Sequence, residues 1–87
     1  MKTASLVSAQ IRAARALLRW SAVDLARQSR LGVNTIRRAE VADEGISLTA
    51  ANELALRSAL ETAGVEFIDE NGGGPGVRLR KRQPKKS

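Results

Sequence analysis

Polar side chains suited to reading nucleic-acid bases recur near the middle of the chain at helical spacing. Asn34, Arg37 and Arg38 follow Val33 at intervals of one, three and one residues. On an α-helix these four positions share the face opposite Ile36. Arginine can donate two hydrogen bonds to O6 and N7 of guanine, asparagine can engage N6 and N7 of adenine, and valine can contact the thymine methyl group. The spacing therefore predicts a base-reading surface; the alternative is that both arginines contact only phosphates.

The sequence offers little other chemistry. It contains no histidine, cysteine or tyrosine, and its carboxylates fall at positions typical of solvated helix surfaces. The glycine-rich segment 72–76 is superficially like a phosphate loop, but it lacks the lysine-serine or lysine-threonine pair and the following helix. We therefore expect no enzyme activity and neither a metal nor another cofactor.

Charge is distributed unevenly along this short chain of 87 residues and net charge +6. Seven arginines and one acid lie between residues 12 and 38, eight acids and one arginine between residues 40 and 70, and six basic residues between 78 and 87. This pattern predicts one basic face that attracts polyanions in a salt-dependent way. The alternative is that the arginines only make an alanine-rich helix soluble.

Length and composition restrict the class of protein further. The chain is long enough for one small core. A core of this size is only marginally stable, and dimerisation could add to its stability. The sequence has no cysteine, no apolar run of membrane-spanning length and no leader-like N-terminus. We therefore expect a cytoplasmic protein of bacterial type with no membrane partner.

Hydrophobic periodicity predicts four helices, over residues 6–19, 22–29, 33–41 and from 48 or 49 to 63. Ser21 is expected to cap the second helix in a capping box with Asp24, and Trp20 to pack on Leu25 as a hydrophobic staple. Gly32 falls at the start of the third helix, and Gly64 ends the fourth. In the fourth helix a row of alanines with Leu48 is expected on one side, with Leu54, Leu56 and Leu60 nearby.

After Gly64 the apolar period changes from that of a helix to that of a strand. Residues 65–67 and 77–80 alternate apolar and polar types around the loop 71–76, which predicts a β-hairpin. We expect a mainly α fold with three parts: a four-helix unit over 1–63, the hairpin over 64–80, and a disordered basic tail over 81–87. The hairpin's apolar face must pack on the fourth helix or on a second molecule, because a lone hairpin is marginal. That face consists of Val65, Phe67, Val77 and Leu79.

Seven residues match the pattern of a known family: Arg15, Ser21, Leu25, Ala26, Thr35, Ile36 and Glu40. Through them the chain resembles the phage-repressor/Cro-type helix-turn-helix (XRE) family over residues 6–60, about two-thirds of its length. The segment VEFIDENGGGPGVRLRK is similar to the C-terminal hairpin of short bacterial members.

The resemblance implies roles for individual residues. Arg15 and Glu40 would form a partly buried ion pair between the first and third helices, the alternative being that Arg15 is one more exposed basic residue. The base-facing positions would be Val33, Asn34, Arg37 and Arg38, in agreement with the helical spacing. The chain departs from the family pattern at Ala22, Arg30 and Gly32, which puts the usual phosphate contact at the start of the second helix in doubt. Phosphate contacts are assigned to Arg19, Ser21, Arg27, Arg30 and Thr35.

The expected function is that of a transcriptional regulator, more specifically a repressor that binds double-stranded DNA at a palindromic operator. A homodimer would read two half-sites about one helical turn apart, with either the hairpin or the fourth helix at its interface. One alternative is an antitoxin that represses its own operon and binds a toxin through its tail. Another is a protein-interaction adaptor that keeps the fold without DNA binding.

Overall fold

The computed structural model of the protein describes residues 6–41 and 48–80 and contains four helices and one hairpin in these ranges. The predicted tail at 81–87 and residues 42–47, between the third and fourth predicted helices, lie outside the described residues. The elements, in chain order, are α1 (Ser8–Leu18), α2 (Ala22–Ser29), α3 (Val33–Val41), α4 (Ala50–Thr62), β1 (Val65–Ile68) and β2 (Gly76–Leu79). The mainly helical fold with a C-terminal hairpin is thus as predicted.

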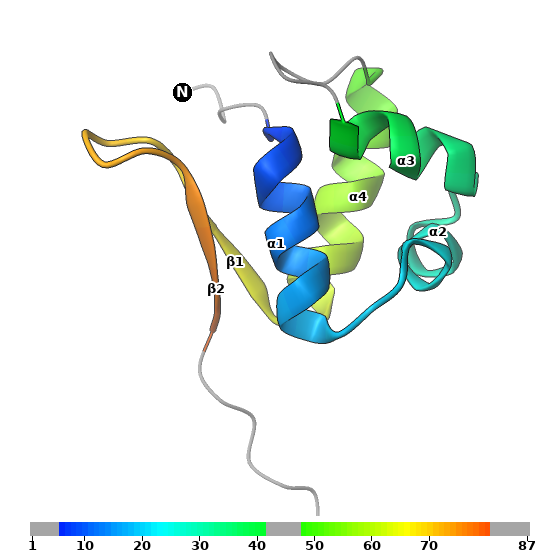
Figure 1. Ribbon diagram of the computed structural model, residues 1–87, viewed down its shortest axis with the longest axis horizontal. Coiled ribbons are helices and arrows are strands. Elements are labelled where there is room, and N and C mark those ends of the chain that lie inside the picture. The colour runs from blue at the N-terminus through cyan, green and yellow to red at the C-terminus, as the bar shows by residue number, and fades with distance from the viewer. Residues whose placement is uncertain (1–5, 42–47, 81–87) are drawn as a thin grey trace, which may run out of the picture.

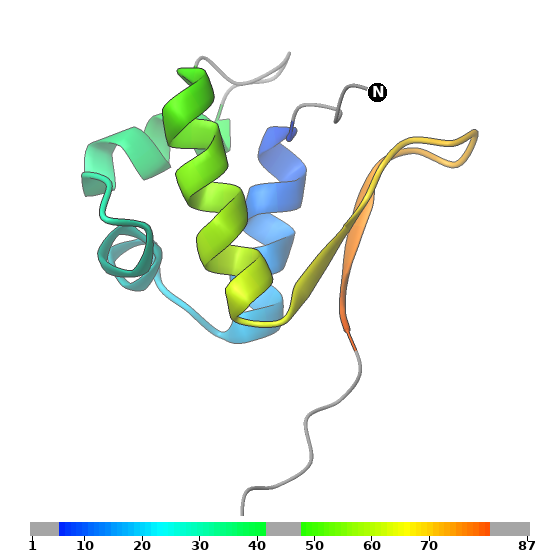
Figure 2. The same cartoon turned by 180° about the vertical axis from the view of Figure 1, so that it is seen from behind.

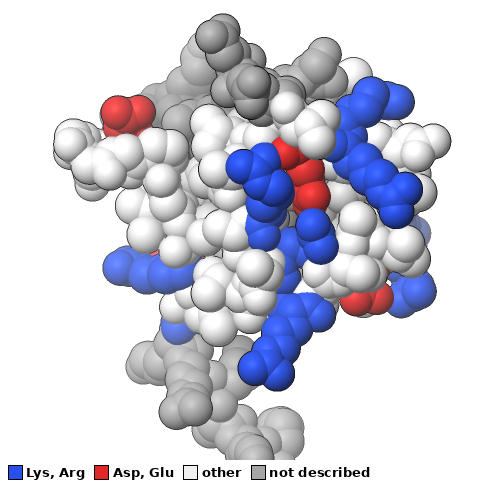
Figure 3. Space-filling view, in the orientation of Figure 1, with Lys and Arg blue, Asp and Glu red and all other residues white. Residues whose placement is uncertain are grey.

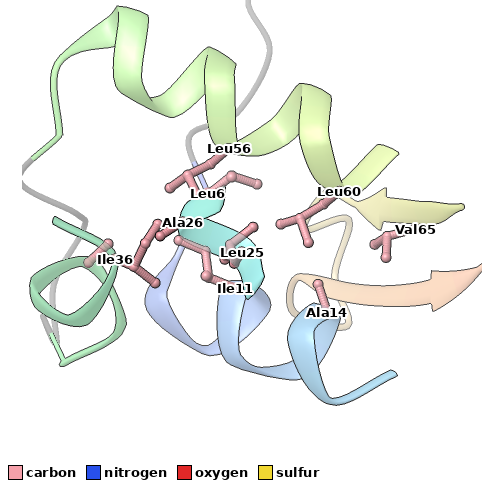
Figure 4. Packing of buried hydrophobic residues seen from close by; sticks show 10 residues of the cluster. Leu6, Ile11, Ala14, Leu25, Ala26, Ile36, Leu56, Leu60 and Val65 are labelled. Atoms are coloured by element: carbon pink, nitrogen blue, oxygen red, sulfur yellow. The ribbon is translucent and has the colours of Figure 1, made fainter. Parts of the chain in front are cut away.

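The helices surround one apolar core to which every element except β2 contributes a buried residue (Figure 4). Figures 1 and 2 show α1 and α4 side by side, with α2 and α3 on one side of this pair and the hairpin on the other. The side chains that are nearly inaccessible to solvent hold the helices together by removing apolar area from water. The largest of them are Leu6, Ile11, Leu25, Ile36, Leu56, Leu60 and Val65.

The structure shows which side of α4 faces the core. Leu56 and Leu60 are buried, whereas Ala51 is exposed and Leu54 is 63% exposed. Two leucines four residues apart remove more apolar area from water than a row of alanines does, so their direction decides how the helix rotates. Of the predicted alanine row with Leu48, Ala59 and Leu48 are partly buried against the core.

The hairpin packs against the helices of its own chain. Its antiparallel register pairs Val65 with Leu79 and Phe67 with Val77, so these four side chains share one face, as the alternation predicts. Val65 is 1% exposed within the core, and Phe67 and Val77 pack against it. The Arg57 guanidinium also lies 5.1 Å from the centre of the Phe67 ring, a cation–π contact that joins α4 to β1.

A buried glutamine on α1 fixes the position of the hairpin. The side-chain amide of Gln10 donates to the carbonyl oxygens of Gly76 at 3.0 Å and Ile68 at 3.4 Å, and its oxygen accepts from the Val7 N–H. A glutamine that is 4% exposed with its hydrogen-bonding atoms partnered in this way stabilises the contact between α1 and the hairpin. Among the described residues, no helix has the length and apolar character needed to cross a membrane.

Candidate nucleic-acid interface

The α2–α3 pair presents the predicted base-reading residues. Its first helix begins at a capping box: the Ser21 hydroxyl accepts from the Asp24 N–H at 3.0 Å, and the Asp24 carboxylate accepts from the Ser21 N–H at 2.8 Å. The hydrogen bond from the Ser21 backbone lowers the pKa of Asp24. Trp20 packs against the core next to this cap, at the position expected of a staple.

A left-handed residue ends each of the first two helices. Arg19 at the end of α1 and Arg30 at the end of α2 have φ angles of 59° and 64°. Such φ angles favour glycine, because a Cβ atom is crowded there. Both arginine side chains are exposed.

The outer face of α3 carries three of the four predicted base-reading side chains. Asn34, Arg37 and Arg38 are exposed, and within the described part of the chain none of these side chains makes a hydrogen bond or ion pair. Val33 differs, because it is half-buried and packs against the core, leaving only part of its side chain for an outside contact. Ile36 on the opposite side is fully buried and holds the helix in place.

An ion pair between α1 and α3 fixes the direction of this face. Arg15 Nε lies 2.7 Å from Glu40 Oε2 and Arg15 Nη2 lies 2.9 Å from Glu40 Oε1, a bidentate arrangement. The third guanidinium nitrogen donates to the Trp20 carbonyl at 3.0 Å. The hydrogen bond to Glu40 raises the pKa of Arg15. The side chain of Glu40 is 8% exposed and that of Arg15 26%, so the pair is partly buried, as the resemblance implies.

Two further side chains of α1 bind the end of α3, and the sequence analysis missed both. The Ser8 hydroxyl donates to the Ala39 carbonyl, and the Arg12 guanidinium donates to the Glu40 carbonyl. These carbonyls lie in the last turn of α3, where no backbone donor of the same helix is available. Ser8, Arg12 and Arg15 lie four and three residues apart on one side of α1, and this spacing was the available signal.

The residues predicted to contact phosphate do not form one continuous group. Ser21 caps α2, and Arg27 is exposed but lies 3.5 Å from the Asp24 carboxylate. Arg19 and Arg30 occupy the ends of α1 and α2. Thr35 is half-buried and lines a depression of about 270 Å³ between α3 and α4, together with Arg38 and Asn52.

Basic side chains gather over α1 and α3 on the face seen in Figure 3, with an acidic group between them. The arginines of this part of the chain outnumber the single acid between residues 12 and 38, so the local field is positive. A positive surface with an exposed helix at its side is suited to a polyanion with hydrogen-bonding groups in a groove.

The residues assigned to dimerisation are mostly occupied within the chain. Val65 is buried, Phe67 and Val77 are half-buried against the core, and only Leu79 is substantially exposed, at 45%. Of the two alternatives for the hairpin's apolar face, packing on the chain's own helices is the one observed. Any contact of the hairpin with a second molecule must therefore use its edge or its outer face.

Comparison with known proteins adds no identification. No protein-family model matches the chain, and no curated protein matches it.

Proposed function

We propose that this chain is a sequence-specific, double-stranded DNA-binding regulator of transcription, built on a helix-turn-helix unit of the phage-repressor type. In this proposal α3 enters the major groove, and a homodimer represses transcription by occupying a palindromic operator. The resemblance stated above motivates the proposal.

The observation that carries the proposal is the contrast between the two sides of α3. Asn34, Arg37 and Arg38 are exposed without partners in the described part of the chain, while Ile36 and Glu40 are buried. A helix fixed on one side and presenting unpaired donors on the other can recognise bases without first losing internal bonds. The Arg15–Glu40 pair supports this reading because it restricts how α3 can rotate.

The test is a selection of the protein against random duplexes at physiological salt, followed by binding of Arg37→Ala and Arg38→Ala to the selected duplex and to a shuffled one. A base-reading arginine is worth about 1–3 kcal/mol, or roughly 5- to 150-fold in affinity, on the selected duplex, and much less on the shuffled one. Arg80→Ala is the charge-matched control, because Arg80 directly follows β2, a strand that Figure 1 shows on the side of α1 away from α3. Equal losses on both duplexes would show that the arginines bind only phosphate.

A further inference from the structure

The outer edge of β2 presents unpaired backbone groups. The Arg80 N–H donates to the Gly64 carbonyl at 2.8 Å, which sets the phase of the antiparallel ladder. Hydrogen-bonded and non-hydrogen-bonded pairs alternate in such a ladder, so Arg78 points its backbone groups inward towards β1. The N–H and C=O groups of Val77 and Leu79 consequently point outward.

No other strand in the described part of the chain pairs with this edge, although β2 is short and Pro75 directly precedes it. Within the described residues, no backbone hydrogen bond uses the outward groups of Val77 and Leu79, and β2 contains neither proline nor lysine. Monomeric proteins commonly protect an exposed strand edge with a proline, an inward-pointing charge or a covering element. Leu79 at this edge is 45% exposed, and on α1 Leu17, which is 40% exposed, lies two turns beyond Gln10, the residue bonded to Gly76.

We propose that β2 pairs with β2 of a second copy of this chain, forming a four-stranded antiparallel sheet about a two-fold axis at Arg78. Val77 of each copy then lies opposite Leu79 of the other, and the outward groups of both residues form four intermolecular hydrogen bonds. This interface gives the homodimer of the proposed function its contact surface, but it does not require DNA.

The hydrogen-bonding pattern and the charges favour a second copy at this edge. Val77 and Leu79, one on each side of Arg78, both direct their backbone groups outward. A two-fold axis at Arg78 therefore brings the donors of one copy opposite the acceptors of the other. Each Arg78 is neutralised by Glu66 of its own chain, with Nε–Oε1 at 3.0 Å and Nη2–Oε2 at 3.2 Å, which limits repulsion at the axis. The β1 edge is less suitable, because Val65, one of the residues whose backbone groups point outward there, is 1% exposed and β1 packs against α4.

The chain contains no cysteine, so a single introduced cysteine reports the register directly. In the proposed sheet Arg78 of one copy lies directly opposite Arg78 of the other in a non-hydrogen-bonded pair, with Cα atoms about 4.5 Å apart, close enough for a disulfide. Glu66 is three strand spacings from its counterpart, about 14 Å, which is too far. The two variants Arg78→Cys and Glu66→Cys remove the same exposed ion pair, and each is therefore the other's control.

Under mild oxidation without DNA, we expect Arg78→Cys to form a covalent dimer at least ten times faster than Glu66→Cys at equal concentration. The unmodified protein should sediment as a dimer, and Leu79→Pro, which removes one outward N–H, should weaken association at least tenfold more than Leu79→Ala. A sedimenting monomer, equal crosslinking of the two variants, or faster crosslinking of Glu66→Cys would each overturn the proposal. Because no duplex is present, failure here is distinct from a failure to bind DNA.

Discussion

Replacing Glu40 by alanine is expected to destabilise the protein far more than removal of an ordinary surface charge. The carboxylate accepts two hydrogen bonds from Arg15, at 2.7 and 2.9 Å, from a side chain that is itself only 26% exposed. Without Glu40, the guanidinium keeps its bond to the Trp20 carbonyl but loses its counter-ion.

The size of the effect follows from burial. Breaking a fully buried ion pair costs about 3–5 kcal/mol, because the remaining charge is left without compensation. Water can reach part of Arg15, so we expect about 2–3 kcal/mol, the upper part of the range of about 1.5–3 kcal/mol for hydrogen bonds to charged groups. For a domain of this size, 1 kcal/mol lowers the melting temperature by roughly 4–8 °C, so the Glu40→Ala variant should melt about 10–20 °C lower.

The assay is thermal and urea unfolding followed by circular dichroism at constant protein concentration. Glu66→Ala is the matched control, because Glu66 makes a bidentate pair with Arg78 in which both side chains are exposed. At a protein concentration low enough for the protein to be monomeric, its unfolding should remain almost unchanged, since exposed pairs contribute little. A double-mutant cycle with Arg15→Ala isolates the pairwise energy. If Glu40→Ala unfolds like Glu66→Ala, the pair does not hold α1 and α3 together.

Three further changes test the local geometry. Gln10→Leu should cost about 1–3 kcal/mol, because the Val7 N–H loses its acceptor and the hairpin carbonyls lose their bonds to α1, and hydrogen exchange of the hairpin amides should rise; unaltered exchange would contradict the anchoring role. Ser21→Ala should cost about 1 kcal/mol in urea unfolding. The hydrogen bond from the Ser21 N–H lowers the pKa of Asp24. The stabilising contribution of the ionised Asp24 carboxylate is therefore present above about pH 4 and is lost as the pH falls through the lowered pKa. Asp24→Asn should flatten the acid limb of the stability curve, and an unchanged limb would argue against this contribution. Arg30→Gly should raise stability by about 1 kcal/mol by removing Cβ crowding; a loss would contradict this.

Local signals predicted the helices well. The bounds of α2 and α3 are those predicted, because Ser21, Gly32 and the apolar period lie within a few residues of the elements they define. Gly64, with a φ of 111°, ends α4 as expected of a left-handed glycine. The face of the hairpin was also predictable, since alternation alone assigns it.

What the sequence analysis missed depends on partners far along the chain. Gln10 bonds to a carbonyl 66 residues away, and Ser8 and Arg12 bond to carbonyls 31 and 28 residues away. Backbone carbonyls carry no side-chain identity, so residue types at a distance give no sign of such bonds. The sequence left open which side of α4 is buried for a related reason: alanines and leucines compete for the core, and only packing against other elements, α2 among them, decides between them.

Helical spacing predicts only part of the candidate interface on α3. Helical periodicity places Asn34, Arg37 and Arg38 together on the outside, and they are exposed. The same periodicity does not show that Val33 turns partly into the core, because that depends on packing at the helix start. Periodicity assigns a residue to a face, but packing determines how much of it remains available.

The affinity ratio between a selected duplex and its shuffled counterpart, measured with the unmodified protein at one physiological salt concentration, tests base recognition by α3 most directly. Recognition by these exposed side chains predicts a ratio of about 1,000 or more. Equal affinity for the two duplexes would contradict it and leave only non-specific attraction between a basic surface and phosphate.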